Sequence, residues 1–354
     1  MIRIIKVLRH LTFIVFHINW WKFFRLLKKG SENVVISNFL TSGKFSTEGT
    51  CWEFGYINYF IKNNINFDYC SLRTQLYGRR VYWSPEKATS PFNVRNYPST
   101  FVHVAKQLEE QGCNCFPNSF EINFLENKKF MHSQFSIKNT PHPQTFVLSS
   151  VSIHNNQVFN PNNKIEKMPF PLLWKGEHSS GSQDIELLKD ETDLANLLET
   201  PDFKVKNPSL IFQEFFDIRR DLRVVVIGEE VVLCFWRINP RKNWAPTASK
   251  FGSTISFENL PTHLYPKFIK EMSNLDLAMG GFDVIFEDDD PEKSYRILEV
   301  SPRYSPNPPA DMSMKKYSYA DYKHRVFVRR SWAYLQTQII FEHADKYVGF
   351  TLKS

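Results

Sequence analysis

The chain has 354 residues, of which 42% are hydrophobic and 23% charged, so it has the composition of an ordinary globular protein with room for two or three packed units. A formal net charge of +7 favours anionic partners such as nucleotides, phosphorylated substrates or a membrane surface, and gives no reason to expect nucleic acid. Five cysteines without a disulfide framework or zinc-ligand spacing exclude a disulfide-stapled secreted domain, and we expect a cytoplasmic protein.

The first thirty residues are basic and aromatic, and no acidic residue appears before Glu32. The uncharged stretch 11–16 is far shorter than the ~20 residues that a membrane-spanning helix needs. No small-residue cleavage site follows it, so a signal peptide is not predicted. A segment of this kind can form an amphipathic helix that lies peripherally on the anionic inner surface of a membrane. An equally good interpretation is a helix docked on the protein's own body.

Residues 31–120 have the pattern of a small α/β domain. Strands are predicted over 33–37 and 65–69, on either side of an apolar helix over 52–61. A further helix is predicted over 101–111, where Gly112 ends it.

Residues 121–208 place two lysines where they could bind an anion. Lys128 lies at the start of a helix that is predicted to run to about residue 137, and a strand over 145–148 follows. A second strand ends at Lys175, before a loop that contains Ser180, Gly181 and Ser182. Backbone N–H groups in such a loop can bind phosphate, with the lysine as a point charge. Ser/Gly loops are common, so this signal alone is weak.

The segment 209–237 reads as three strands in succession. The first runs into a polar break at Asp217, and the next two, over 219–227 and 231–237, are joined by a tight turn at Gly228. His178, beside the Ser/Gly loop, could contact phosphate, but we expect it to be exposed to solvent.

The most informative feature is a pair of carboxylates in the apolar segments 280–286 and 295–301, which flank an acidic turn. This pattern predicts two antiparallel strands, with Asp283 opposite Glu299 on one face with Ile285, Ile297 and Ser301. Like charges across a ladder repel, so a half-buried pair needs a cation, and Mg²⁺ on a nucleotide phosphate suits these oxygen ligands. The alternative is an ordinary charged hairpin whose acids face water.

In chain order these motifs resemble the ATP-grasp superfamily of carboxylate–amine ligases, and in particular its branch with glutathione synthetase and the ribosomal-protein glutamate ligase. The similarity covers about residues 101–305. The motifs that carry it are two lysine positions, a linker, a strand pair with an acid and two arginines, and a metal pair. In this chain they are Asn127-Lys128 with Pro143-Gln144-Thr145, Pro171 with Lys175, Gln213-Glu214-Phe215-Phe216, Asp221 to Gly228 with Arg237, and Asp283-Val284 with Glu299-Val300.

The resemblance implies an α+β (α/β) ATP-grasp fold, in which two α+β lobes clasp ATP. A small α/β pre-grasp domain and the basic amphipathic N-terminal helix precede them. The implied divisions are residues 1–30 for that segment, 31–120 for the pre-grasp domain, 121–208 for the N-lobe and 209–354 for the C-lobe. The C-lobe includes a C-terminal helix predicted over 322–340.

The resemblance also implies cofactors and roles. ATP is implied together with Mg²⁺, with Mn²⁺ as the alternative ion. The phosphates would lie under Lys128, Lys175 and the Ser180–Gly181–Ser182 loop. The backbone of Gln213, Glu214, Phe215 and Phe216 would read the adenine, with Asp221 near the ribose and Leu298 also on the nucleotide. Arg237 would act with Lys175 in catalysis by steadying the γ-phosphate and the oxyanion, and Asp283 and Glu299 would hold the metal.

Three departures from the family limit this transfer. Ser301 stands where the family has asparagine, so Asn307 or a water would complete the metal shell. The Ser/Gly loop is poor in glycine, and the segment 241–252, which faces the acceptor in relatives, does not match residue by residue. The carboxylate and amine substrates and the oligomeric state are not identified. A kinase that phosphorylates a hydroxyl, or a non-catalytic ATP-binding protein, remain as alternatives.

Overall fold

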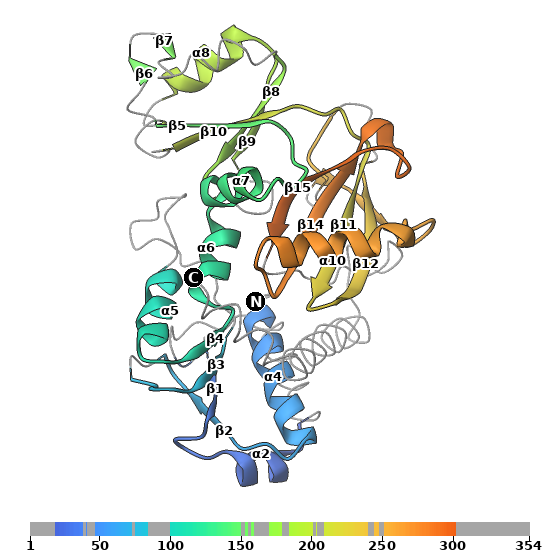
Figure 1. Ribbon diagram of the computed structural model, residues 1–354. Coiled ribbons are helices and arrows are strands. Elements are labelled where there is room, and N and C mark those ends of the chain that lie inside the picture. Colours follow the sequence, from blue (N-terminus) through green and yellow to red (C-terminus); the bar gives the residue numbers. More distant parts are fainter. Residues whose placement is uncertain are drawn as a thin grey trace, which may run out of the picture.

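The computed structural model describes residues 18–37, 40, 47–72, 75–83, 100–149, 153–154, 157–158, 170–178, 184–200, 203, 209–239, 244–247 and 251–301. Residues 1–17, the Ser180–Gly181–Ser182 loop, Asn307 and the predicted C-terminal helix lie outside these residues. The described chain forms three sheets with helices around and between them (Figure 1), and a short pair of β6 (Ile153–His154) with β7 (Gln157–Val158). None of the helices in the described part has the length and apolar character that a bilayer span requires.

The first sheet is parallel, with the strand order β2-β1-β3-β4. Its strands are β1 (Asn33–Ile36), β2 (Phe67–Cys70), β3 (Arg80–Tyr82) and β4 (Asn114–Phe116). Every residue of β1 is buried, as expected for a parallel strand that is covered on both faces. Helices α2 (Trp20–Leu26) and α4 (Thr47–Lys62) pack on one face, and α5 (Thr100–Glu110) packs on the other. The helices and strands predicted for this part are confirmed.

The second sheet is antiparallel, with the order β5-β10-β8-β9. It consists of β5 (Thr145–Ser149), β8 (Leu172–Gly176), β9 (Ile185–Leu188) and β10 (Ser209–Glu214). Helix α8 (Glu191–Glu199) covers it through Leu194 and Leu197. Because β10 belongs to this sheet, a division by sheets falls after Glu214 rather than at residue 208. The division of the chain into domains itself stays a proposal.

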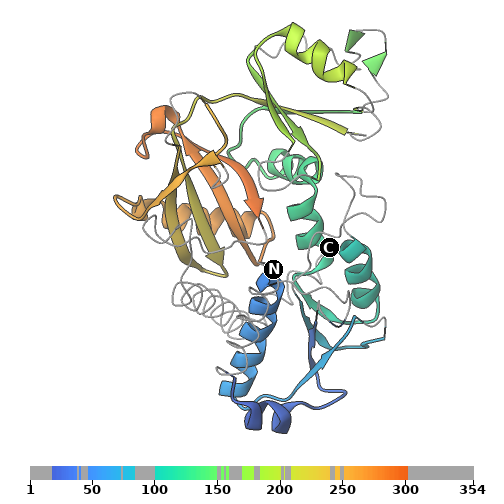
Figure 2. The ribbon, with the colours of Figure 1, turned by 180° about the vertical axis from the view of Figure 1, so that it is seen from behind.

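The third sheet is antiparallel, with the order β13-β12-β11-β14-β15. Its strands are β11 (Arg220–Ile227), β12 (Glu230–Ile238), β13 (Thr254–Ser256), β14 (Met279–Phe286) and β15 (Tyr295–Ser301). Helix α10 (Tyr265–Asn274) covers one face, as Figures 1 and 2 show from opposite sides. Leu222, Val224 and Val226 join the core on that face. The alternate residues of β11 therefore project to the other face.

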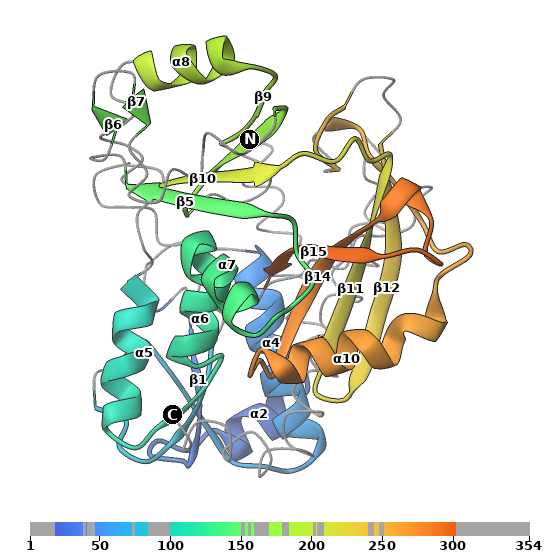
Figure 3. The same ribbon diagram turned by 45° about the horizontal axis from the view of Figure 1, so that its top comes forward.

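Two short helices, α6 (Ser119–Glu126) and α7 (Lys128–Ile137), lie where the three sheets meet (Figure 3). The buried Glu121 of α6 accepts a hydrogen bond from Ala278 N (2.8 Å), just before β14. At the start of α7, Lys128 N donates to Glu177 O (2.9 Å), directly after β8. These contacts hold Lys128 at the junction of the second and third sheets.

Candidate active site

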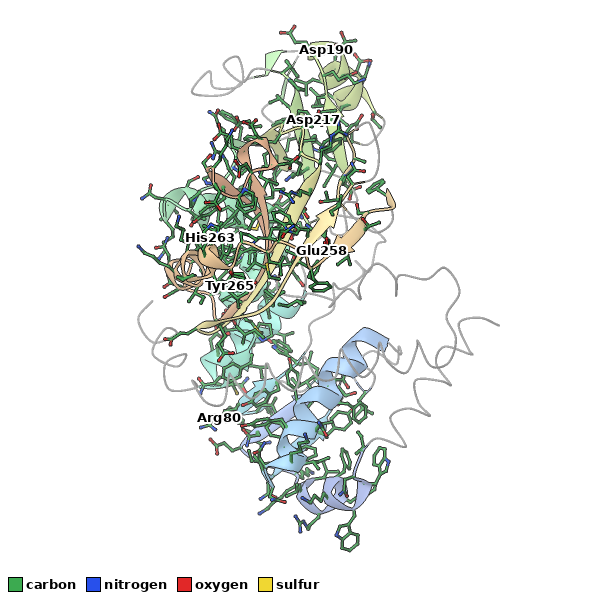
Figure 4. The ribbon with its side chains drawn as sticks, turned by 90° about the vertical axis from the view of Figure 1, so that its right-hand side faces the viewer. Arg80, Asp190, Asp217, Glu258, His263 and Tyr265 are labelled. Atoms are coloured by element: carbon green, nitrogen blue, oxygen red, sulfur yellow. The ribbon has the colours of Figure 1, made fainter. Side chains whose placement is uncertain are left out.

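A cleft lies between the second and third sheets. Its walls come from β8, β9 and β10, from β11, β12, β14 and β15, and from the segment 244–247. Nine residues predicted from the sequence line it together: Lys175, Gln213, Glu214, Phe216, Asp221, Arg237, Asp283, Leu298 and Glu299. In the view of Figure 4, Asp217 marks the linker between the two sheets, and Tyr265 marks α10.

The polar wall of the cleft is a row of charged side chains that runs across four strands of the third sheet. Asp221 and Arg223 are two residues apart on β11 and therefore share a face. Asp221 is paired in register with Arg237 on β12, and Arg223 is paired with Asp283 on β14. Asp283 is in turn paired with Glu299 on β15, as predicted. Pairing across an antiparallel sheet thus brings together charges that are far apart in the sequence.

Asp221 is buried and binds Arg237 with both oxygens. Arg237 Nε donates to Oδ1 (2.7 Å) and Arg237 Nη2 donates to Oδ2 (2.5 Å), a bidentate geometry. Thr247 Oγ1 also donates to Oδ2. Burial alone would lower the pKa of Arg237, but Asp221 and Asp283 raise it above its ordinary value, so the guanidinium stays charged.

Asp283 is balanced by two guanidinium groups. Arg223 Nε lies 2.7 Å from Oδ1 and Arg237 Nη2 lies 2.9 Å from Oδ2. Glu299 has a longer contact, 3.9 Å from Lys128 Nζ. The prediction that the two carboxylates need a cation is therefore met by the chain's own side chains. The sequence pattern did not reveal that Arg223 lies opposite Asp283, and the prediction that the pair also holds a metal ion stays a prediction.

A β-bulge decides which residues of β15 face the cleft. Asp283 pairs with Glu299, but the next residue, Val284, pairs with Ile297, so β15 carries one extra residue, Leu298. Leu298 and Glu299 both line the cleft, together with Ile285. The prediction that Ile297 shares this face is wrong, because the bulge turns Ile297 into the core beneath α10.

Lys175 is buried at the end of β8 and donates to Gln213 Oε1 (2.5 Å). The amide of Gln213 in turn donates to Thr145 Oγ1 (3.1 Å). Burial lowers the pKa of Lys175, Glu299 opposes this shift and Lys128 adds to it, and the resulting pKa is about 8. Gln213, predicted as a linker residue, lies within β10, and its side chain holds this lysine in place.

The linker between the two sheets follows β10. Glu214 ends the strand and binds the start of β5 through its backbone N–H to Gln144 O (2.9 Å). Phe216 lines the cleft, whereas Phe215 packs against Trp244, with ring centroids 5.5 Å apart. Phe216 and Trp244 therefore supply aromatic surface to the cleft.

The carboxylate pair offers a partial ligand set for a divalent ion. Asp283 Oδ1 is buried and receives no hydrogen bond of normal geometry, although Arg223 is close. Ser301 Oγ lies 3.5 Å from Glu299 Oε1, so it borders this pair. Within the described residues no group of three acidic, histidine or cysteine side chains forms a larger metal site. Two cross-strand carboxylates leave the remaining ligand positions to phosphate oxygens and water, which is how Mg²⁺ is commonly held.

One residue of the site differs from the prediction, and three others were given no role from the sequence. His178 is buried, not exposed, because its ring packs against α6 with Nδ1 3.1 Å from Glu126 O. Arg223 and Trp244 belong to segments quoted from the sequence but were given no role of their own, and Thr247 was not singled out. The two-residue spacing of Asp221 and Arg223 could have revealed Arg223, since a strand places such residues on one face.

Asp283 is expected to stabilise the fold even without a ligand, because its loss leaves Arg223 without its carboxylate. Asp283→Ala should lower the free energy of unfolding by about 3 kcal/mol, measured by urea denaturation without nucleotide. The matched control is Glu292→Ala, whose side chain is 77% exposed, and which should change stability by less than about 0.5 kcal/mol. Equal effects of the two substitutions would show that Asp283 is an ordinary solvated acid.

Comparison with known proteins identifies the family. The profile of the RimK-like ATP-grasp domain matches residues 127–307, more than half of the chain. The glutamate–LysW ligase ArgX of Sulfurisphaera tokodaii is 24% identical over 204 residues, which are 56% of this chain and 68% of the relative. The α-aminoadipate–LysW ligase LysX of Sulfolobus acidocaldarius is 31% identical over 146 residues, 38% of this chain and 49% of the relative.

Solved structures support the fold. An ATP-grasp RimK domain protein of Sphaerobacter thermophilus has a TM-score of 0.54 at 12% identity and covers 87% of this chain and 98% of its own. D-alanine–D-alanine ligase of Bacillus anthracis has a TM-score of 0.54 at 11% identity, with 89% and 98% covered. The predicted ATP-grasp fold is confirmed. The chain therefore belongs to the RimK-like ATP-grasp family and is an ATP-dependent carboxylate–amine ligase.

Proposed function

We propose that the cleft binds ATP with one or two Mg²⁺ ions, or Mn²⁺, and activates a substrate carboxylate as an acyl phosphate. A carboxylate oxygen would attack the γ-phosphorus and ADP would leave. An amine would then attack the acyl carbon, phosphate would leave, and the nitrogen would lose a proton to give the amide. The observation that carries this proposal is the single cleft that combines a buried lysine, an anchored arginine and paired carboxylates.

Each side chain has a role in this scheme that follows from its position. Lys175 and Lys128 would neutralise the phosphates, together with the Ser180–Gly181–Ser182 loop. Arg237 would stabilise the negative charge that develops on the γ-phosphate and on the tetrahedral oxyanion. The linker of Gln213, Glu214, Phe215 and Phe216 would hold the adenine, with Leu298 packing beneath the nucleotide.

Asp283 and Glu299 would hold the divalent ion, with Ser301, Asn307 or water completing its ligands. When bound, the ion would neutralise charge on the β- and γ-phosphate oxygens. In this scheme the chain itself supplies no nucleophile. Catalysis rests on positioning the reactants and on the charges that surround them.

Substrate identity is a separate proposal. The names of the relatives describe ligation of glutamate or α-aminoadipate to LysW. We propose that one of the two substrates, the carboxylate or the amine, is an amino acid, and this class is the first to test. The segment 244–247 borders the cleft, and this position suits a role in selecting the substrate.

The ligase proposal is tested by trapping the acyl phosphate. Carboxylic acids are screened for ADP release with MgATP and hydroxylamine, which converts an acyl phosphate to a hydroxamate. We expect hydroxamate that depends on the acid and is lost in Arg237→Ala, by about a hundredfold or more. ADP release with a stable phosphate ester and no hydroxamate would contradict the proposed acyl-phosphate step.

Nucleotide affinity should depend on pH through Lys175. Its pKa of about 8 in the free protein means that the ammonium form, which phosphate prefers, is lost as the pH rises. ATP affinity is therefore expected to fall about fivefold between pH 8 and pH 9, measured by calorimetry. Lys175→Gln should bind ATP more weakly and without this pH dependence, whereas Lys128→Gln should keep the dependence but move it to higher pH, because Lys128 lowers the pKa of Lys175. A flat profile in the unsubstituted protein would contradict this role.

We also propose a cytoplasmic location with a peripheral contact at the inner membrane surface. Trp21 and Phe24 on α2 are 78% and 67% exposed, and the neighbouring Lys22 and Arg25 are cationic. Aromatic side chains beside cations suit an anionic interface. The opposite side of this helix, with Phe23 and Leu26, packs on the first sheet, in agreement with the interpretation of a docked helix for this part of the segment.

A further inference from the structure

Asp221 is the most completely engaged carboxylate of the cleft. It is only 1% exposed, and its two oxygens receive three donors from Arg237 and Thr247. The bidentate pair with Arg237 is reinforced by register, because the two residues lie directly opposite each other on β11 and β12. A ribose hydroxyl could reach this carboxylate only by displacing a charge-assisted hydrogen bond inside a buried pair, which is costly.

Asp283, the second partner of Arg237, also binds another arginine. Asp283 shares its oxygens between Arg237 and Arg223, at 2.9 Å and 2.7 Å. If Asp283 serves a cation, as the proposed function requires, its hold on the guanidinium weakens. Asp221 has no such competing role and remains the fixed anchor of Arg237.

Thr247 connects this anchor to the segment 244–247, which lines one side of the cleft. The segment 244–247 is tied to the end of β12 by Asn239 Nδ2, which donates to Ala245 O (3.1 Å). At its other side Trp244 packs on Phe215 of the linker. The hydroxyl of Thr247 therefore fixes Asp221 from a segment that is itself held at both sides.

We propose that Asp221 and Thr247 are positioning residues that hold Arg237 toward the γ-phosphate, and that Asp221 does not bind the ribose. The inference rests on the proposed ATP site and replaces the role that family resemblance gives to Asp221. It predicts that the two ends of the nucleotide respond differently when the anchor is weakened.

The test compares two affinity ratios by calorimetry in the full chain with Mg²⁺. The ATP/ADP ratio reports the γ-phosphate contact, and the ATP/2′-deoxyATP ratio reports the ribose contact. In Asp221→Asn we expect the ATP/ADP ratio to fall by at least about tenfold, the loss of one charge-assisted hydrogen bond. The ATP/2′-deoxyATP ratio should stay within about twofold of the unsubstituted protein, a difference of a few tenths of a kcal/mol.

A milder pair of variants covers the case in which Asp221→Asn does not fold. Thr247→Val removes the hydroxyl donor but keeps the shape, and should lower the ATP/ADP ratio about threefold. Thr247→Ser keeps the hydroxyl and should restore the ratio.

Either of two results would overturn the inference: a changed ATP/2′-deoxyATP ratio, or an unchanged ATP/ADP ratio in every folded variant. Absence of ATP binding in the unsubstituted protein would instead remove the proposed function, so the two failures are distinguishable.

Discussion

The site depends on one row of charges that crosses the third sheet. Arg237, Asp221, Arg223, Asp283 and Glu299 come from four strands, and register alone makes them neighbours. With Lys128 and Lys175 beside it, the row sets four cations against three carboxylates. Buried charges are tolerated only when each has a partner, so a shift of register in any of these strands would both destabilise the fold and disperse the site.

The surrounding structure serves to keep this row in place. Helix α10 covers the far face of the sheet, so the charged face is the one that remains for ligands. Helices α6 and α7 join the three sheets and bring Lys128 to Glu299. The second sheet contributes Lys175 from the opposite wall, fixed by Gln213 and Thr145. A cation that approaches phosphate from each wall suits an anion held between two lobes.

The sequence allowed most strands, the hairpin of Asp283 and Glu299 and the two lysines to be predicted, because these features are local or repeat with a strand's period. Three others depend on tertiary contacts and could not be predicted. The bulge at Leu298 moves Ile297 to the other face of the sheet, and no glycine in this strand indicates a bulge in the sequence. The burial of His178 follows from its packing on α6. The use of Gln213 as a support for Lys175 requires two strands to be adjacent. Arg223 is an intermediate case, since its shared face with Asp221 was predictable but its partner was not.

The most direct test of the account is calorimetric ATP binding with and without Mg²⁺, on the unsubstituted protein and on Glu299→Gln. If the charged row is the metal and nucleotide site, ATP binds with Mg²⁺ and the substitution weakens that binding by about tenfold or more, with the fold intact. Equal binding by both proteins, or no nucleotide binding by a folded sample, would contradict the assignment of this row.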